Sequence, residues 1–217
     1  MNTSATLQDD VERELRWDPS IKAEQVGVTV NGEVVQLDGT VNSLWEKWAA
    51  EDAALRVRNV KAVANELKVA WPSSENCADT DIAKAAVSQL EWNYSVPNNV
   101  KVKVSNGWIT LEGTVEAQYQ RNEAERALRS LRGAKGILNE ITVKPKVSVS
   151  VVKANISDAF KRSAAIDASH IQVESTDGKV TLRGHVRTYA ERAEAQRTAW
   201  SAPGVTNVDD LLTISWE

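Results

Sequence analysis

One five-residue pattern occurs three times in the chain and decides its fold. It reads LDGTV at Leu37–Val41, LEGTV at Leu111–Val115 and LRGHV at Leu182–Val186. Around these centres, residues 26–69, 100–143 and 171–214 align without a gap, at offsets of 74 and then 71 residues. Twenty-six residues after each central glycine stands Asn65, Asn139 or Asp210. So many matches at fixed spacing identify three copies of one unit.

Each unit opens with apolar residues four positions apart, which predicts one face of a helix. The three sets are Leu7, Val11 and Leu15; Ile82, Ala86 and Leu90; and Val152, Ile156 and Phe160. The hydroxyl residues Thr6, Thr80 and Ser150 stand where a helix N-cap is expected.

A tight turn is predicted in the middle of each unit. Alternating apolar residues, such as Val26, Val28 and Val30, lead into Asn31-Gly32, Asn106-Gly107 and Asp177-Gly178. These dipeptides are strong signals for a two-residue β-hairpin turn. The pair in the first unit lies one position earlier than in the other two, although the loop keeps its length. A different turn type is therefore predicted there.

After the central glycine comes a predicted helix with small or apolar residues along one side, and then a final alternating strand. The helix positions are Ala50, Ala54 and Val57; Ala124, Leu128 and Leu131; and Ala195, Ala199 and Ala202. The order helix, strand, strand, helix, strand predicts an α+β fold with two helices on one face of a three-stranded sheet. The crossover helix should make the second and third strands parallel, so the sheet is mixed. The predicted modules span residues 6–71, 80–145 and 149–216.

The composition is that of an ordinary globular protein. The 217 residues carry a formal net charge of −4, which gives no reason to expect a nucleic-acid partner. Cys77 is the single cysteine, so neither an intramolecular disulfide nor a thiolate metal cluster is expected. Met1–Asp10 lacks the basic start and apolar centre of a secretory signal, and no run approaches the ~20 apolar residues of a membrane span. A cytoplasmic location is the expectation, with the periplasm as the alternative.

The repeated pattern resembles the BON domain, a family named for bacterial OsmY and nodulation proteins. A turn glycine, V-x-L-x-G-x-V, an Ala-rich helix and a terminal V-x-N-x-L/I-x-V carry the resemblance. It is closest in the third unit, where Pro203-Gly204-Val205 matches the helix-to-strand turn. The resemblance implies a bacterial, transport-associated protein of osmotic or envelope stress, without catalytic residues or cofactors. It also implies domains that attach to phospholipid surfaces or act as interaction modules.

The histidines offer little chemistry. His170 lies just before a predicted strand and His185 lies within one. Neither has a Glu, Cys or His partner at the spacing of a metal site, so no metal is expected and a structural role is predicted for both.

Two repeated positions have structural interpretations. The central glycines stand singly inside strands, where glycine marks a bulge or a close backbone approach and not a phosphate loop. They are Gly39, Gly113 and Gly184. For Asn65, Asn139 and Asp210 we predict turns or side-chain-to-backbone hydrogen bonds, in preference to an acid–base role.

The tryptophans occupy two kinds of position. Trp17 and Trp92 end first helices, whereas Trp71 and Trp216 end last strands, and all four are predicted to pack at a core edge or between modules. The outward side of the second helix differs among the units: Leu44, Trp48 and Leu55; Gln118, Asn122 and Arg129; and Tyr189, Ala193 and Trp200. This side is either a contact between modules or a membrane or partner surface.

The second unit adds a basic cluster on and just after its second helix. Its members are Arg121, Arg126, Arg129, Arg132 and Lys135. Such a cluster attracts anionic lipid, whereas the interleaved Glu123 and Glu125 are typical of an ordinary solvated helix.

The leading hypothesis is a non-catalytic protein that attaches peripherally to anionic phospholipid surfaces or to envelope proteins. The alternative is a cytoplasmic protein-interaction or chaperone-like scaffold. The candidate lipid or partner surface consists of Arg121, Arg126, Arg129, Arg132, Lys135, Leu44, Trp48, Leu55, Tyr189 and Trp200. The sequence leaves the oligomeric state, the arrangement of the modules and the role of Cys77 open.

Overall fold

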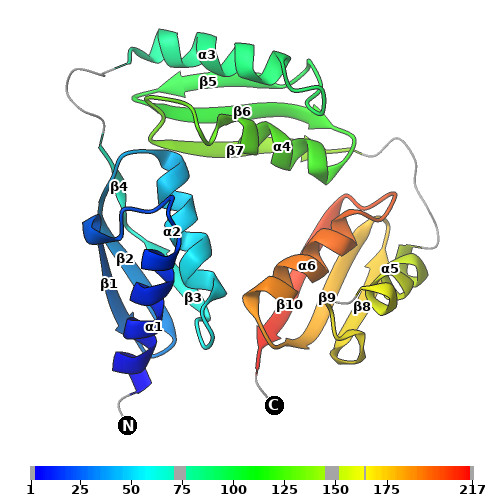
Figure 1. Cartoon of the computed structure of the whole chain (residues 1–217). Coiled ribbons are helices and arrows are strands. Elements are labelled where there is room, and N and C mark those ends of the chain that lie inside the picture. The colour runs from blue at the N-terminus through cyan, green and yellow to red at the C-terminus, as the bar shows by residue number, and fades with distance from the viewer. Residues whose placement is uncertain (1–2, 71–76, 145–151, 164, 216–217) are drawn as a thin grey trace. The chain divides into compact units, whose positions relative to one another are not determined.

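The computed structural model describes residues 3–70, 77–144, 152–163 and 165–215. Three modules follow one another along the chain, and in each of them two helices pack on one face of a mixed sheet (Figure 1). The α+β fold class predicted from the sequence is confirmed.

Module 1 contains two helices and a sheet whose third strand is interrupted. Its elements are α1 (Thr3–Trp17), η1 (Ala23–Gln25), β1 (Val26–Asn31), β2 (Val34–Val41), α2 (Leu44–Arg56), β3 (Ala62–Asn65) and β4 (Lys68–Val69). The central strand β2 pairs antiparallel with β1 and parallel with β3 and β4. Between β3 and β4 the ladder continues through the Glu66 backbone N–H, which donates to the Leu37 carbonyl at 2.8 Å.

Modules 2 and 3 have an uninterrupted third strand. Module 2 comprises α3 (Asp79–Glu91), β5 (Lys101–Ser105), β6 (Trp108–Val115), α4 (Gln118–Leu128) and β7 (Gly136–Val143). Module 3 comprises α5 (Val152–Arg162), η3 (Ala168–His170), β8 (Ile171–Thr176), β9 (Lys179–Val186), α6 (Tyr189–Trp200) and β10 (Asn207–Ile214). The central strands β6 and β9 each lie between their two neighbours, and β9 pairs antiparallel with β8 and parallel with β10.

The apolar residues spaced four apart on the first helix of each module form one wall of its core. All nine predicted residues are buried, with at most 7% of any side chain exposed. The small residues predicted on the second helix, such as Ala50, Ala124 and Ala195, are fully buried. Because small side chains bring a helix backbone close to the sheet, this stripe sets the layer spacing of the module.

The hairpin turns differ in type, as predicted. The two central turn residues are Asn106 and Gly107 in module 2, and Asp177 and Gly178 in module 3. In each pair both residues have positive φ, the pattern of a type I′ turn. In module 1 the loop residues are Gly32 and Glu33, and only Gly32 has positive φ, the pattern of a type II′ turn.

The predicted N-caps of the first helices are wrong where the structure describes them. Thr6 lies inside α1, which begins at Thr3, and Thr80 is the second residue of α3; Ser150 lies outside the described residues. Hydroxyl caps occur instead on the second helices, where Ser43 Oγ and Thr188 Oγ1 accept from the backbone N–H groups of Glu46 and Glu191 at 3.0 Å.

The central glycines are required by the backbone. Gly39 and Gly184 have φ of +119° and +122°, a region that side-chain-bearing residues rarely adopt. A Cβ atom on Gly39 would lie 2.2 Å from the Gln25 carbonyl oxygen, and one on Gly184 would lie 2.0 Å from the His170 carbonyl oxygen. Gly113 shares the conformation, with φ of +143°. The prediction of a close backbone approach is confirmed for Gly39 and Gly184, so these glycines belong to the fold.

Candidate functional site

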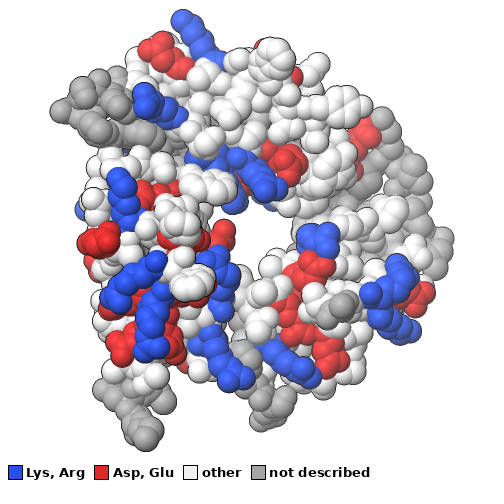
Figure 2. Space-filling model, viewed as in Figure 1, with Lys and Arg blue, Asp and Glu red and all other residues white. Residues whose placement is uncertain are grey.

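The basic cluster of module 2 is only partly available to a ligand. Arg126, Arg132 and Lys135 are exposed, whereas Arg121 and Arg129 are half-buried. Arg129 forms an ion pair of 3.3 Å with Glu125, one turn earlier on α4. On the face shown in Figure 2, Lys and Arg side chains lie among Asp and Glu side chains within the modules. The interleaved acids therefore moderate the positive charge, as the solvated-helix alternative requires.

The predicted outward residues of the other second helices lie closer to their cores than the sequence pattern indicates. Leu55 is half-buried against the core of module 1. Tyr189 and Trp200 are half-buried against the core of module 3. Leu44 is 2% exposed, and Trp48 is half-buried. The use of these residues as a lipid or partner surface stays a prediction.

The most exposed aromatic side chains lie at the ends of first helices. Trp17 is 83% exposed, Trp92 is 88% exposed, and Tyr94 is fully exposed two residues beyond Trp92. The prediction that Trp17 and Trp92 pack at a core edge is therefore wrong. Trp71 and Trp216 lie outside the described residues.

The tryptophan end of module 2 also lies near the last turn of α4. Gln89, one turn before Trp92, donates from Nε2 to Ser130 Oγ at 3.5 Å. Ser130 directly follows Arg129, and exposed Arg132 lies two residues further on. Beyond Ser130 the chain runs toward the start of α3, where Gly133 packs against Ile82, so the exposed rings and the basic side chains belong to one module but lie toward different ends of α3. We call Trp92, Tyr94, Arg129 and Arg132 the aromatic–basic patch.

A polar cluster joins the second helix of each module to its last strand. In module 1 the Asn65 Nδ2 donates to Glu51 Oε2 at 2.9 Å and to the Lys47 carbonyl at 3.0 Å. Asn139 Nδ2 donates to Glu125 Oε2 at 3.2 Å in module 2. The predicted backbone hydrogen bond is confirmed in module 1, where Asn65 Oδ1 accepts from the Leu67 N–H at 3.2 Å.

Module 3 contains the same polar cluster with the charge moved to the strand. Here Gln196 takes the position of Glu51, and it donates to the Asp210 carboxylate. Arg192 Nε donates to Asp210 Oδ2 at 2.6 Å, and the Leu212 N–H donates to Oδ1 at 2.9 Å. Every module thus has one carboxylate and one amide at this joint, which is typical of a structural bond and not of an acid–base pair.

Asn65→Asp is expected to destabilise module 1 by about 2 kcal/mol at neutral pH, because it places a second carboxylate against Glu51 in a half-buried site. Glu51→Gln/Asn65→Asp restores the single charge, in the arrangement of module 3, and should recover most of the loss. Chemical denaturation of the full chain, with hydrogen exchange to identify the module, measures both variants. Equal stability of the two variants would contradict the charge argument.

Two buried glutamates, Glu46 and Glu191, stabilise the fold and were not predicted from the sequence. Glu46 Oε1 accepts from the Lys22 N–H and Oε2 accepts from the Asn42 N–H, both at 2.9 Å. In module 3, Glu191 Oε1 accepts from the Asp167 N–H at 2.8 Å and its Oε2 accepts from the Arg187 N–H at 2.7 Å. Each carboxylate therefore ties the loop after the first helix to the start of the second. The S/T-x-x-E signature of a capping box, present at Ser43–Glu46 and Thr188–Glu191, could have identified them.

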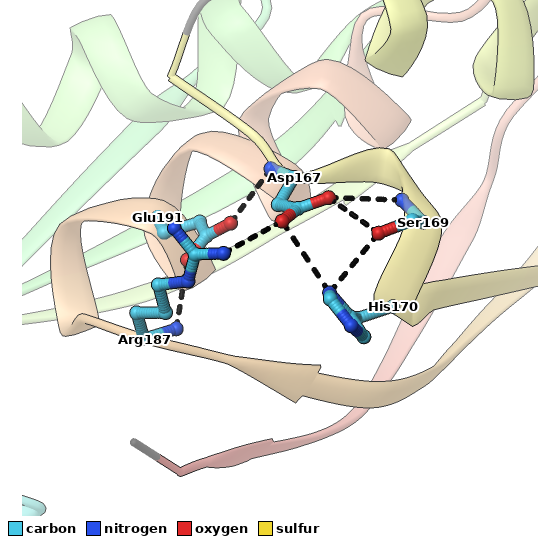
Figure 3. Close-up of polar contacts among 5 residues, drawn as sticks. All are labelled: Asp167, Ser169, His170, Arg187 and Glu191. Atoms are coloured by element: carbon cyan, nitrogen blue, oxygen red, sulfur yellow. Dashed lines mark hydrogen bonds and ion pairs between the residues drawn. The ribbon is translucent and has the colours of Figure 1, made fainter. Parts of the chain in front are cut away.

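A polar cluster surrounds Asp167 beside this bond (Figure 3). The Asp167 carboxylate accepts from the N–H and Oγ of Ser169 at 3.2 and 2.6 Å and from Arg187 Nη2 at 2.9 Å. His170 Nδ1 lies 3.4 Å from Asp167 Oδ2, and the His170 and His185 rings contact each other with centroids 4.4 Å apart. The hydrogen bonds from Ser169, aided by the nearby His170 and Arg187, hold the pKa of Asp167 below its ordinary value of 3.8.

This pKa shift gives the stability of module 3 an acid-sensitive component. A depressed folded-state pKa stabilises the fold above the ordinary value, and the contribution disappears as the pH falls through the folded-state pKa. We therefore expect Asp167→Asn to make the stability of module 3 fall less steeply below about pH 4 than in the wild type. Hydrogen exchange of the β9 amides across this pH range measures the effect. Parallel pH profiles for the two proteins would contradict the assignment.

The described residues contain no group of three or more His, Cys, Asp or Glu side chains placed to hold a metal ion. Within those same residues, no helix combines the length and the apolar character needed to cross a bilayer. The polar clusters described above form hydrogen bonds to backbone and side-chain partners within their own modules.

Comparison with known proteins agrees with the repeat. Residues 3–70, 78–145 and 148–215 each match the BON domain. Osmotically-inducible protein Y of Escherichia coli (strain K12) is 26% identical over 140 residues, which cover 60% of this chain and 70% of that protein.

Several solved structures also match, among them two with low TM-scores. CdsD, a structural protein of the type III secretion system of Chlamydia trachomatis, is 16% identical with a TM-score of 0.26, covering 97% of this chain and 93% of the other. The PrgH periplasmic domain is 12% identical with a TM-score of 0.25, covering 88% and 96%. At these scores neither likeness supports a functional argument.

The three BON matches cover nearly the whole chain, and each coincides with one helix-strand-strand-helix-strand module of the structure. BON domains are generally non-catalytic. The chain therefore belongs to the BON domain family, with three BON domains in tandem and a distant similarity to Osmotically-inducible protein Y.

Proposed function

We propose that this protein is a non-catalytic attachment protein that binds phospholipid surfaces peripherally through the aromatic–basic patch of module 2. The observation that carries the proposal is the exposure of Trp92 and Tyr94, at 88% and 103%. Leaving two large aromatic rings in water costs free energy that a lipid interface recovers, because Trp and Tyr favour the headgroup region of a bilayer.

Basic residues of the same module supply the electrostatic part of the attachment. Arg132 is exposed, and Arg129 is half-buried and paired with Glu125 on α4. Each basic side chain close to an anionic membrane contributes roughly 1 kcal/mol, so the patch should prefer anionic to neutral lipid. The similarity to Osmotically-inducible protein Y supports a role in osmotic or envelope stress.

Co-sedimentation with vesicles at low salt tests the proposal. The full chain should pellet with phosphatidylglycerol-containing vesicles, and Trp92→Ala/Tyr94→Ala should weaken binding at least about 10-fold. Arg129→Glu/Arg132→Glu should weaken binding to anionic vesicles and make the remaining binding insensitive to lipid charge.

A matched control removes another exposed aromatic side chain of the same module. Tyr119, in the first turn of α4, is 59% exposed and lies outside the patch, so Tyr119→Ala should bind as the wild type does. If the wild type fails to pellet with anionic vesicles, or if Tyr119→Ala is as weak as the patch variants, the proposed function is wrong.

A further inference from the structure

The side-chain contacts between the first and second helices differ between modules 1 and 2. In module 1, Arg56 at the end of α2 reaches across to α1: its Nε donates to Glu14 Oε1 at 2.9 Å, and its Nη2 lies 3.5 Å from Asp18 Oδ2. One guanidinium group therefore sits between two carboxylates. In module 2 the corresponding bond is neutral, from Gln89 to Ser130.

Module 3 has small residues at all three of these positions. When the repeats are aligned, Ala159, Ser163 and Ser201 replace Glu14, Asp18 and Arg56. A groove of about 460 Å³ lies between α5 and α6 at this place. Ala159 and Ser201 line it, so the space that the module 1 ion pairs occupy is open here.

Positive charge faces this groove from both helices. Arg162 lines it from α5 and Arg197 lines it from α6. Asp158 also lines the groove, but it forms an ion pair of 3.6 Å with Lys161 on its own helix. The groove thus differs from the same place in module 1, because the two carboxylates are replaced by small residues and two guanidinium groups line the space instead.

Arg197 keeps donors available in spite of a local partner. Its Nε donates to Glu194 Oε2 at 2.7 Å, and this bond lowers the pKa of Glu194 and raises that of Arg197. A guanidinium group has five N–H donors, and a fork to one carboxylate uses two of them. The remaining donors can reach a second anion.

We propose that the groove between α5 and α6 binds a phosphate group, held between Arg162 and Arg197. Guanidinium groups match the oxygens of phosphate in geometry and in charge. Thr198 and Asn155 line the same groove and supply neutral donors. This site uses no residue of the aromatic–basic patch, so it stands independently of the proposed attachment to membranes.

Titration of the full chain with inorganic phosphate at constant low ionic strength, followed by NMR chemical shifts, tests the site. Saturable shifts at Arg162, Arg197 and Thr198 are expected. Arg162→Ala should weaken binding at least 10-fold, and Glu194→Gln should tighten it by freeing Arg197. Arg183→Ala removes an exposed arginine on the sheet of the same module and should leave binding unchanged.

Module 1 supplies a second variant. Ala159→Glu/Ser201→Arg refills the groove with the ion pair of module 1 and should abolish phosphate binding while the melting temperature is kept. The proposal is overturned if the wild type shows no saturable shifts, or if Arg183→Ala weakens binding as much as Arg162→Ala.

Competition experiments show whether the bound phosphate group belongs to a lipid headgroup or to a soluble phosphate ester. If phosphatidylglycerol vesicles displace inorganic phosphate, and Arg162→Ala removes that competition, the site takes a lipid headgroup. If glycerol phosphate competes and vesicles do not, the site takes a soluble phosphate ester; both results support the shared chemistry. Trp92→Ala/Tyr94→Ala should leave phosphate binding intact, so failure of the groove and failure of the membrane patch can be told apart.

Discussion

Gly39→Ala is expected to unfold module 1 or to remove most of its stability, a loss of about 3 kcal/mol or more. The new methyl group would lie 2.2 Å from the Gln25 carbonyl oxygen, where only backbone movement could relieve the clash. The φ of +119° adds strain that any L side chain would feel. A module of about 65 residues buries only about 60% of the surface that its unfolded chain exposes, less than a larger domain does, and has little stability to lose.

Gly32→Ala is the matched control for this prediction. Gly32 also has positive φ, but no atom lies within 4 Å of the place that its Cβ would take. Backbone strain alone should cost about 1 kcal/mol there. Thermal unfolding followed by circular dichroism, with hydrogen exchange to locate the change, compares the two variants. Equal losses would show that the contact with Gln25 is not what requires glycine.

Glu191→Ala is expected to destabilise module 3 by roughly 2–4 kcal/mol. The Glu191 side chain is 8% exposed and accepts from the backbone N–H groups of Asp167 and Arg187. Removing it leaves both donors without their charged acceptor and releases the loop before β8. Hydrogen exchange in residues 165–170 should rise before exchange in β9 does.

Module 2 provides the comparison for the buried glutamate. Gln120 occupies the same position, and its Oε1 accepts only from the local N–H groups of Glu116 and Ala117, at 2.9 and 3.1 Å. Gln120→Ala should therefore cost about 1 kcal/mol, the usual value for a lost cap. A loss as large as that of Glu191→Ala would contradict the role given to the bond between the two loops.

Much of the fold could be predicted because its determinants are local. The spacing of Val11, Ala86 and Ile156 with their neighbours predicted the buried face of each first helix, and the shifted Asn31-Gly32 pair predicted a different turn. The hydrogen bond between Asn65 and the Leu67 backbone could also be predicted, because the two residues are only two positions apart.

The candidate site was harder to predict because it depends on contacts between distant segments. Trp17 and Trp92 end amphipathic helices, and periodicity does not tell whether a terminal tryptophan turns toward the core or into solvent. The Glu191 bond joins residues 24 positions apart, which only the folded chain brings together. The contact between the His170 and His185 rings could not be predicted from their spacing, because it depends on the register of β8 and β9.

The modules share a scaffold and differ at their helix ends. Position by position, Trp17 and Trp92 correspond to Arg162, and Arg56 corresponds to Ser130 and Ser201. The conserved part of the repeat within this chain, the central glycines and the joint at Asn65, Asn139 and Asp210, serves the fold. The divergent part lies at the surface, and both proposed binding sites fall there.

NMR of the tryptophan side chains can show whether the protein attaches to lipid through the aromatic end of module 2. The chain has eight tryptophans, whose indole N–H signals can be followed separately in the presence of bicelles that contain a nitroxide-labelled lipid. We expect the Trp92 signal to be attenuated most, and the signals of Trp48 and Trp200, which are half-buried, to be affected much less. Attenuation of Trp48 or Trp200 with Trp92 unaffected, or no attenuation of any signal, would contradict the proposed attachment.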